Sequence, residues 1–145
     1  MRTTNQAAIY CMFKENNRNF YVLAKRNPER GNFWQPFTGG EEDFDNNNLL
    51  KTVIREIKEE IGIDISEKDI INIDNNFSFT DKEGVLRTET CFGVILKLEN
   101  KNLINLSPEH DSIIYSTDIE YLKSIMKYEQ NRAGLEKFNE IINKL

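Results

Sequence analysis

The sequence contains few cysteine, proline and histidine residues. Its 145 residues include two cysteines, three prolines and one histidine. Two cysteines far apart in the chain give neither a disulfide framework nor the spacing of a zinc site. Cys11 and Cys91 lie in apolar runs, so we expect both to be reduced and to act as small buried apolar residues. No run of about 18 apolar residues occurs, which argues against a membrane-spanning helix.

Acidic residues outnumber basic ones, 24 to 19. The formal net charge is −5 at pH 7, whereas nonspecific binding to a nucleic acid polymer needs a basic surface. The first six residues, MRTTNQ, lack an apolar signal segment, which predicts a cytoplasmic protein. The sequence has no internal repeat and no low-complexity linker, and a chain of this length can bury an ordinary core. We therefore expect one domain over residues 1–145.

What the sequence does contain is an unusually acidic helical segment. The spacing predicts a helix over residues 48–61, in which Glu56, Glu59 and Glu60 fall within an arc of about 100°. The neighbouring arc is apolar and carries Leu49, Val53, Ile57 and Ile61. Like charges three and four positions apart repel by a few tenths of a kcal/mol per pair. A bound Mg²⁺ ion removes this cost, because hard cations prefer oxygen ligands.

The other elements are predicted from apolar periodicity. Strands are predicted over residues 7–14, 20–25, 70–79, 88–98 and 112–115, and further helices over residues 117–128 and 131–143. Residues 33–40 hold three aromatic side chains before a glycine pair, and residues 103–106 form a weaker apolar patch. The acidic helix is expected to begin at an Asn47 or Asn48 cap and to end at Gly62. This mixture of elements predicts an α/β protein.

The acidic helix resembles the second half of the signature of the Nudix hydrolases. The segment Arg55-Glu56-Ile57-x-Glu59-Glu60-x-Gly62-Ile63 matches every defined position of the family pattern Arg-Glu-U-x-Glu-Glu-x-Gly-U, where U is aliphatic. The resemblance implies an α/β/α sandwich of the α+β class, with a mixed β-sheet and a metal-binding helix. It also implies an enzyme that hydrolyses a nucleoside diphosphate linked to another group X. Water attacks phosphorus in that reaction, and the implied ion is Mg²⁺, with Mn²⁺ as the alternative.

The first half of the signature departs from the family pattern. Counting back from Arg55 places Glu41 where the family has glycine and Asn47 where it has glutamate. If Gly39 or Gly40 is the family glycine, the loop carries one or two extra residues. Either way, the family glutamate is missing from its place.

Two hypotheses account for the missing glutamate. In the first, Asp45 or Glu42 moves toward the metal and becomes a ligand. In the second, the site works with the helix acids and Glu109 from a late loop. The run of three asparagines before the helix favours the second, because a free loop costs roughly 1–2 kcal/mol per residue to order.

The resemblance also assigns roles to the helix residues. In the family the signature arginine holds a glutamate in place, so Arg55 inherits a positioning role. One of the helix acids, or Glu109, serves as the base that activates water. The expected catalytic residues are therefore Arg55, Glu56, Glu59 and Glu109. The expected metal ligands are Glu56, Glu59, Glu60 and the carbonyl of Gly40.

Shorter likenesses point to one subgroup of the family. Phe33-Trp34-Gln35, Arg87-x-Glu89, Glu109-His110 and Asn131-Arg132 resemble segments of the Nudix subgroup that hydrolyses dihydroneopterin triphosphate and dATP. This likeness implies a small phosphorylated substrate, a (deoxy)nucleoside or pterin triphosphate. The expected substrate-binding residues are Trp34, Arg26, Arg87, Gly39 and Gly40. We expect a monomer or a homodimer, with neither a nucleic acid polymer nor a membrane as partner.

Two rival interpretations stand beside the enzyme. The displaced first half of the signature also suits a Nudix-fold module that binds a nucleotide or a protein without turnover. Alternatively, the acidic helix is only the solvated face of an unrelated α/β protein. Metal titration separates this last interpretation from the other two, and turnover separates the enzyme from the binding module.

Overall fold

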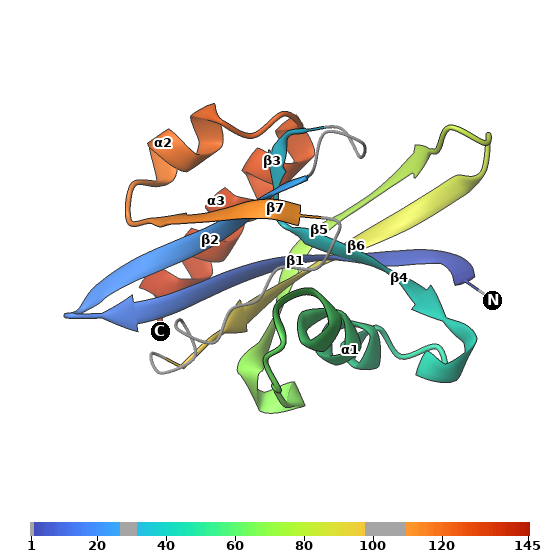
Figure 1. Cartoon of the computed structure of the whole chain (residues 1–145), viewed down its shortest axis with the longest axis horizontal. Helices are drawn as coiled ribbons and strands as arrows, with labels where there is room; N and C mark the ends of the chain where they lie inside the picture. The colour runs from blue at the N-terminus through green and yellow to red at the C-terminus, as the bar shows by residue number, and fades with distance from the viewer. Residues whose placement is uncertain (1, 27–31, 98–109) are drawn as a thin grey trace.

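A mixed β-sheet forms the centre of the molecule, with helices packed on both of its faces (Figure 1). The structure is a computed structural model that describes residues 2–26, 32–97 and 110–145. The strands are β1 (Arg2–Glu15), β2 (Arg18–Arg26), β3 (Trp34–Gln35), β4 (Phe37–Glu42), β5 (Ile70–Thr80), β6 (Leu86–Ile95) and β7 (His110–Ser116). The helices are α1 (Leu49–Ile61), α2 (Ile119–Ser124) and α3 (Glu129–Asn143), with short 3-10 helices η2 (Asp43–Asp45) and η3 (Glu67–Asp69).

The central strand is β1, which is paired along both edges. On one edge it runs parallel to β6, with Ala8 opposite Cys91. On the other edge its first half pairs with β4 and its second half with β2, both antiparallel. Strand β2 also pairs with β3 and β7, and β5 pairs with β6. Between β3 and β4 the chain therefore passes from β2 to β1, and it does so at Pro36, which has no backbone N–H to donate to a ladder.

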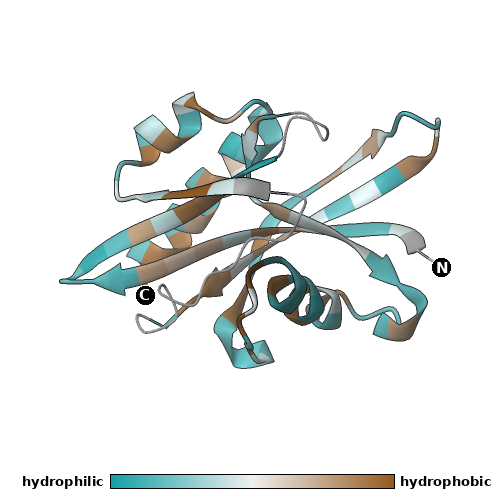
Figure 2. Cartoon of the chain, viewed as in Figure 1, coloured by the Kyte–Doolittle hydropathy of each residue, from teal (hydrophilic) through white to brown (hydrophobic). Residues whose placement is uncertain are grey.

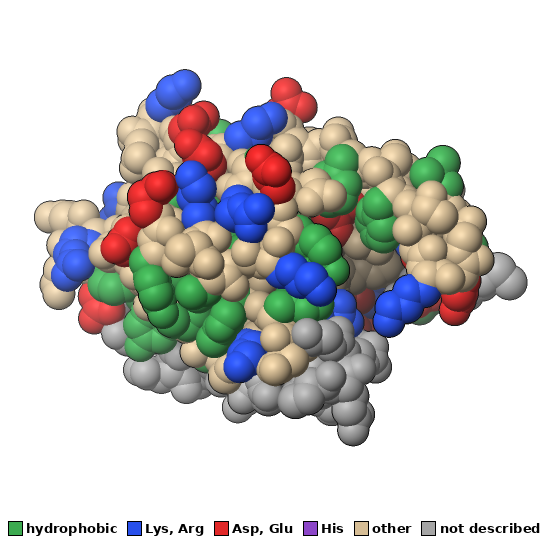
Figure 3. Space-filling view, turned by 90° about the horizontal axis from the view of Figure 1, so that it is seen from above, with side chains coloured by type: hydrophobic (Ala, Val, Ile, Leu, Met, Phe, Trp, Pro, Cys, Tyr) green, Lys and Arg blue, Asp and Glu red, His purple; other side chains and the backbone are tan. Residues whose placement is uncertain are grey.

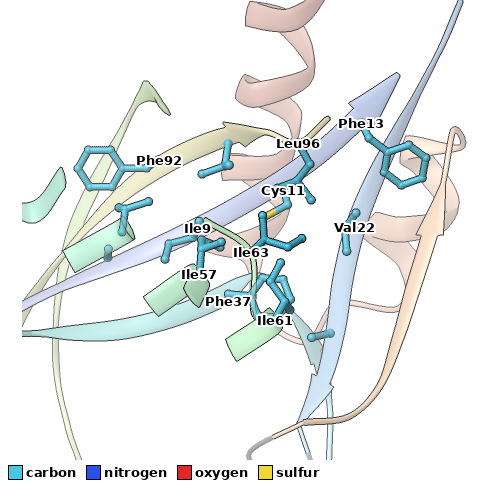
Figure 4. Close-up of a cluster of buried hydrophobic side chains, with 14 residues drawn as sticks. Ile9, Cys11, Phe13, Val22, Phe37, Ile57, Ile61, Ile63, Phe92 and Leu96 are labelled. Carbon is cyan, nitrogen blue, oxygen red and sulfur yellow. The ribbon is translucent and has the colours of Figure 1, made fainter. Parts of the chain in front are cut away.

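Side-chain alternation along β1 divides the core into two clusters. In Figure 2 the hydrophobic residues of β1 and β2 gather in the middle of the sheet. Ala7, Ile9, Cys11 and Phe13 pack with Val53, Ile57 and Ile61 of α1 (Figure 4). Ala8, Tyr10 and Met12 pack with Leu122 of α2 and with Leu135, Phe138 and Ile142 of α3. The predicted α/β/α sandwich with a mixed sheet is confirmed, and both cysteines are free and buried, as predicted.

Local signals placed α1 correctly. The side chain of Asn48 accepts a hydrogen bond from the backbone N–H of Leu50, and Gly62 ends the helix with a left-handed φ of 75°. The predicted bounds of 48–61 are therefore confirmed. None of the helices that the structure describes is long and apolar enough to cross a membrane.

Other boundaries differ from the prediction. Strand β1 begins at Arg2 instead of residue 7, because its polar first residues are paired with both β4 and β6. Strand β6 begins at Leu86, opposite Thr80 of β5. Helix α2 ends at Ser124, several residues before the predicted end, and α3 begins at Glu129. The predicted apolar patch 103–106 lies outside the described residues.

The close packing of β6 against α3 generates a prediction. A Cβ built on Gly93 would lie 2.3 Å from Cε1 of Phe138. Gly93→Ala is therefore expected to destabilise the protein by about 1–3 kcal/mol, although alanine usually stabilises a strand relative to glycine. Urea unfolding measures the change. Adding Phe138→Leu should make the double variant lose less stability than the sum of the two single variants, and strict additivity would contradict the packing argument.

Candidate active site

The side chain of Arg55 connects α1 to the end of β4 and to η2. Its Nη2 donates to the carbonyl of Gly40 at 2.9 Å and to Oδ2 of Asp45 at 2.8 Å, and its Nε lies 3.3 Å from Oδ1 of Asp45. Its Nη1 donates to Oε1 of Glu56 at 2.8 Å and approaches Oε2 of Glu59 at 3.4 Å. One guanidinium group thus lies between three carboxylates and a backbone carbonyl, which suits its planar set of donors.

Asp45 is the partner of Arg55 that the signature pattern did not place. Its carboxylate is buried and also accepts hydrogen bonds from Oγ1 of Thr52 and from the backbone N–H of Glu42, both at 2.9 Å. Burial opposes ionisation of Asp45, but the hydrogen bonds from Arg55, Glu42 and Thr52 lower its pKa below the ordinary value of 3.8. Asp45 lies two positions before Asn47, where the family glutamate was expected. The sequence signal for Asp45 was therefore an acidic residue near the place of the family glutamate, displaced from it by the inserted loop.

The asparagine run is a compact connection and does not form the free loop that we expected. Asn46 and Asn47 both adopt left-handed conformations, with φ of 55° and 57°, which asparagine tolerates better than most residues. Asn46 donates its N–H to the carbonyl of Asp43, and Asn48 donates to that of Asp45. This local order removes the reason for which the sequence favoured Glu109 over Asp45.

Glu56 lies directly against the backbone of Gly39. A Cβ built on Gly39 would lie 2.1 Å from Cγ and 2.6 Å from Oε1 of Glu56, so only glycine fits there. Burial raises the pKa of Glu56 from 4.5 to about 7; Arg55 opposes the rise, and Glu59 and Glu60 add to it. The structure therefore places, at the junction of β4 and α1, a carboxylate whose ionised form is disfavoured by burial and by the neighbouring acids.

The remaining helix acids differ in exposure. The side chain of Glu59 is 55% exposed, whereas Glu60 is buried. Three carboxylates on one helix are the oxygen donors that Mg²⁺ and Mn²⁺ prefer, and the raised pKa of Glu56 fits a nearby cation. Among the described residues, no three His, Cys, Asp or Glu side chains converge closely enough to enclose a metal ion. The donors thus fit a metal by their chemistry and do not form a closed cage.

The predicted substrate-binding residues come from other parts of the sheet. Trp34 packs against the core cluster on the α3 side, and Arg26 pairs its backbone N–H with the carbonyl of Phe33. Arg87 donates its Nε to Asp81 at 2.6 Å, on the β5–β6 hairpin. The structure brings Gly39 and Gly40 to the helix acids and leaves Trp34, Arg26 and Arg87 on separate strands. Glu109 lies outside the described residues.

The raised pKa of Glu56 gives a pH prediction for the protein in EDTA. Between pH 4.5 and about 7 the folded state keeps a proton that the unfolded state has released, so the free energy of unfolding falls as pH rises through this window. The loss is at most about 3 kcal/mol. Glu56→Gln removes the titrating group, so the variant is expected to keep at pH 8 the stability that the wild type loses. Glu140→Gln, an exposed change on α3, is the control for urea unfolding at several pH values. Parallel wild-type and Glu56→Gln profiles would contradict the prediction.

The Asp45–Arg55 pair generates a second prediction for this site. Asp45→Asn removes the charge that faces a largely buried guanidinium group, so we expect a loss of about 2–4 kcal/mol in urea unfolding at pH 7. Asp74→Asn makes the same change at an exposed residue of β5 and should cost less than about 0.5 kcal/mol. Equal effects of the two substitutions would show that the pair contributes nothing to stability.

The profile of the NUDIX domain matches residues 3–136. No curated protein matches the sequence. The Ap4A hydrolase of C. elegans, in a binary complex, is 19% identical over 99% of this chain and 100% of its own, with a TM-score of 0.77. The E. coli dihydroneopterin triphosphate pyrophosphohydrolase is 22% identical over 98% and 97%, with a TM-score of 0.75.

A third similar structure is the NUDIX domain of Shewanella oneidensis NrtR, complexed with ADP ribose. It is 10% identical over 95% of this chain and 87% of its own, with a TM-score of 0.74. At these identities the structures show a shared fold, whereas the profile covers nearly the whole chain, including β4, α1 and the acids around Arg55. The interpretation of the acidic helix as the solvated face of an unrelated protein is therefore wrong. The chain belongs to the Nudix family, whose hydrolases act on acid anhydrides of phosphate and generally use divalent metal ions.

Proposed function

We propose that this protein hydrolyses a phosphoanhydride bond in a nucleoside diphosphate linked to a group X, by metal-dependent attack of water on phosphorus. The observation that carries the proposal is the position of the buried Glu56 carboxylate, which lies between the backbone of Gly39 and the guanidinium group of Arg55. A carboxylate so placed is costly to bury in its ionised form unless a further cation shares the site. We propose that residues 1–145 act as one domain.

The metal ligands of this proposal are Glu56, Glu59, Glu60 and the carbonyl of Gly40. Mg²⁺, or Mn²⁺ in its place, supplies positive charge to the phosphate oxygens when bound. Gly40 already accepts a hydrogen bond from Arg55, and a carbonyl oxygen can accept a second interaction. Arg55 is a positioning residue, because it orients Glu56 and fixes the backbone of Gly40 relative to α1.

A base must take a proton from the attacking water. Glu59 is the most exposed of the three helix acids and lies one turn from Arg55, which makes it a base that solvent can reach. Glu56, Glu60 and the late-loop Glu109 remain alternatives for this role. Whichever carboxylate accepts the proton, the others retain the negative charge that binds the metal.

We further propose a (deoxy)nucleoside or pterin triphosphate as the substrate, with Trp34, Arg26 and Arg87 as binding residues. The Nε atom of Arg26 is buried without a hydrogen-bond partner among the described residues, and a substrate oxygen would satisfy it. The fold shared with the E. coli dihydroneopterin triphosphate pyrophosphohydrolase supports this substrate class, as do the short segments around Trp34 and Arg87. The expected cytoplasmic location and the monomer or homodimer stay predictions.

The main argument for a binding module without turnover was the displaced first half of the signature. Asp45 supplies a buried carboxylate for Arg55 despite that displacement. The loop therefore keeps an acid in contact with the signature arginine, and the enzyme is the better-supported proposal.

Loss of one helix acid tests the proposed function. Purified protein with Mg²⁺ is incubated with nucleoside triphosphates, dihydroneopterin triphosphate, dinucleotides and sugar nucleotides, and phosphate or pyrophosphate release is measured. Glu59→Gln is expected to lower kcat/KM by about 100-fold or more while leaving the melting temperature in EDTA nearly unchanged, because its side chain is largely exposed.

Glu67→Gln, an exposed acid outside α1, is the matched control and should retain wild-type turnover. EDTA should abolish activity, and Mg²⁺ should restore it. Wild-type turnover by the Glu59→Gln variant would remove Glu59 from the site. Binding of these compounds by the wild type without any turnover would favour the binding module instead.

A further inference from the structure

A buried carboxylate outside the candidate active site, that of Glu89, lies on the sheet face opposite α1. Glu89 of β6 is only 4% exposed, and the side chain of Gln6 on β1 donates to its Oε1 at 2.5 Å. Gln6 is the one hydrogen-bond partner of Glu89 among the described residues, so its Oε2 has none there. Burial raises the pKa of Glu89, and the hydrogen bond from Gln6 opposes the rise. A buried acid whose one partner among the described residues is an amide is costly to the fold, which favours a functional role.

An aromatic side chain lies beside Glu89. Phe77 of β5 is directly opposite Glu89 in the β5–β6 pair, so both side chains lie on the same face of the sheet. The Phe77 ring is partly buried and packs against the α3-side core. Asn75 of β5 connects this region to α3 by donating to the carbonyl of Gln130. In Figure 3 acidic atoms are visible in a hollow between the helical layer and the β5–β6 hairpin.

The register of the sheet connects Glu89 to the candidate active site. Gln6 is opposite Gly40 on β4 and opposite Glu89 on β6, so Gly40, Gln6 and Glu89 form one row across three strands. Adjacent strands lie about 4.8 Å apart, which puts Glu89 about 10 Å from Gly40. A sugar or a short side chain spans that distance between a ring and its phosphates. The row continues to Phe77 of β5, about 14 Å from Gly40, so a substrate held at Gly40 would reach past its sugar to Glu89 and Phe77 with its ring.

We propose that Glu89 determines the specificity for the substrate's heterocyclic ring. Its carboxylate accepts hydrogen bonds from the edge of the ring while the ring stacks on Phe77. The proposal rests on the proposed function and deepens it. An ionised carboxylate offers acceptors only, so it matches an edge with two adjacent N–H donors, as in the 2-amino-4-oxo ring of guanine or a pterin, and these donors would favour the ionised form that burial disfavours. The 6-amino edge of adenine offers one donor and one acceptor. Gln6 donates to Oε1, and Oε2 has no hydrogen-bond partner among the described residues.

The test uses analogues of dGTP and dATP whose α,β-bridging oxygen is replaced by methylene, so that binding does not depend on turnover. Calorimetry with Mg²⁺ should find the guanine analogue bound more tightly by the wild type. Glu89→Gln turns one acceptor into a donor, and is expected to weaken the guanine analogue by about 10-fold or more and the adenine analogue by less than about 3-fold. Glu83→Gln, an exposed change on the same hairpin, should alter neither affinity.

A second variant keeps the proposal testable if Glu89→Gln does not fold. Phe77→Leu removes the stacking surface and should weaken both analogues alike, by about 10-fold. Equal affinity of the wild type for the two analogues would overturn the proposal, as would a loss of stability in Glu89→Gln without a change in their ratio. The latter result would mean that Glu89 only stabilises the contact between β1 and β6. Failure of the proposed function appears differently, as binding of the analogues with no hydrolysis of any natural compound.

Discussion

The guanidinium group of Arg55 is the contact on which the candidate site depends. It holds Asp45, Gly40 and Glu56 together, and these residues come from a 3-10 turn, a strand and a helix. A lysine carries one compact ammonium group and could not present this planar set of donors. Without Arg55 the buried acids would repel each other with no cation between them, and unpaired buried charge is among the most destabilising features a protein can contain.

Three of the buried carboxylates, Asp45, Glu56 and Glu89, have pKa values shifted in different directions or for different reasons because their partners differ. Asp45 accepts hydrogen bonds from Arg55, Thr52 and a backbone N–H, which lower its pKa despite burial. Glu56 shares Arg55 with Asp45 and lies beside further acids, so burial prevails and its pKa rises. Glu89 has an amide as its partner, which compensates little of the cost of burial. The additional hydrogen bonds from Thr52 and a backbone N–H thus keep Asp45 ionised, whereas burial disfavours the ionised forms of Glu56 and Glu89.

Strand β1 lies between the candidate active site at Glu56 and the buried Glu89. Its odd-numbered residues pack toward α1 and its even-numbered residues toward α3, so one strand borders both faces of the sheet. Gly39 is opposite Ala7 and faces Glu56, whereas Gly40 is opposite Gln6, the partner of Glu89. Two consecutive glycines in β4 therefore lie between the acids of α1 and the face on which we propose that a substrate ring binds.

The sequence by itself determined α1, because a helix of period 3.6 with an Asn48 cap and a Gly62 stop depends on contacts within one segment. The same local pattern identified Arg55 and the acids of its helix. The role of Asp45 was decided only by the tertiary structure, because an inserted turn moved the acid along the chain while leaving it beside Arg55 in space. Glu89 likewise became a candidate only through the pairing of β1 with β6, since residues 83 positions apart share a hydrogen bond that no sequence periodicity encodes.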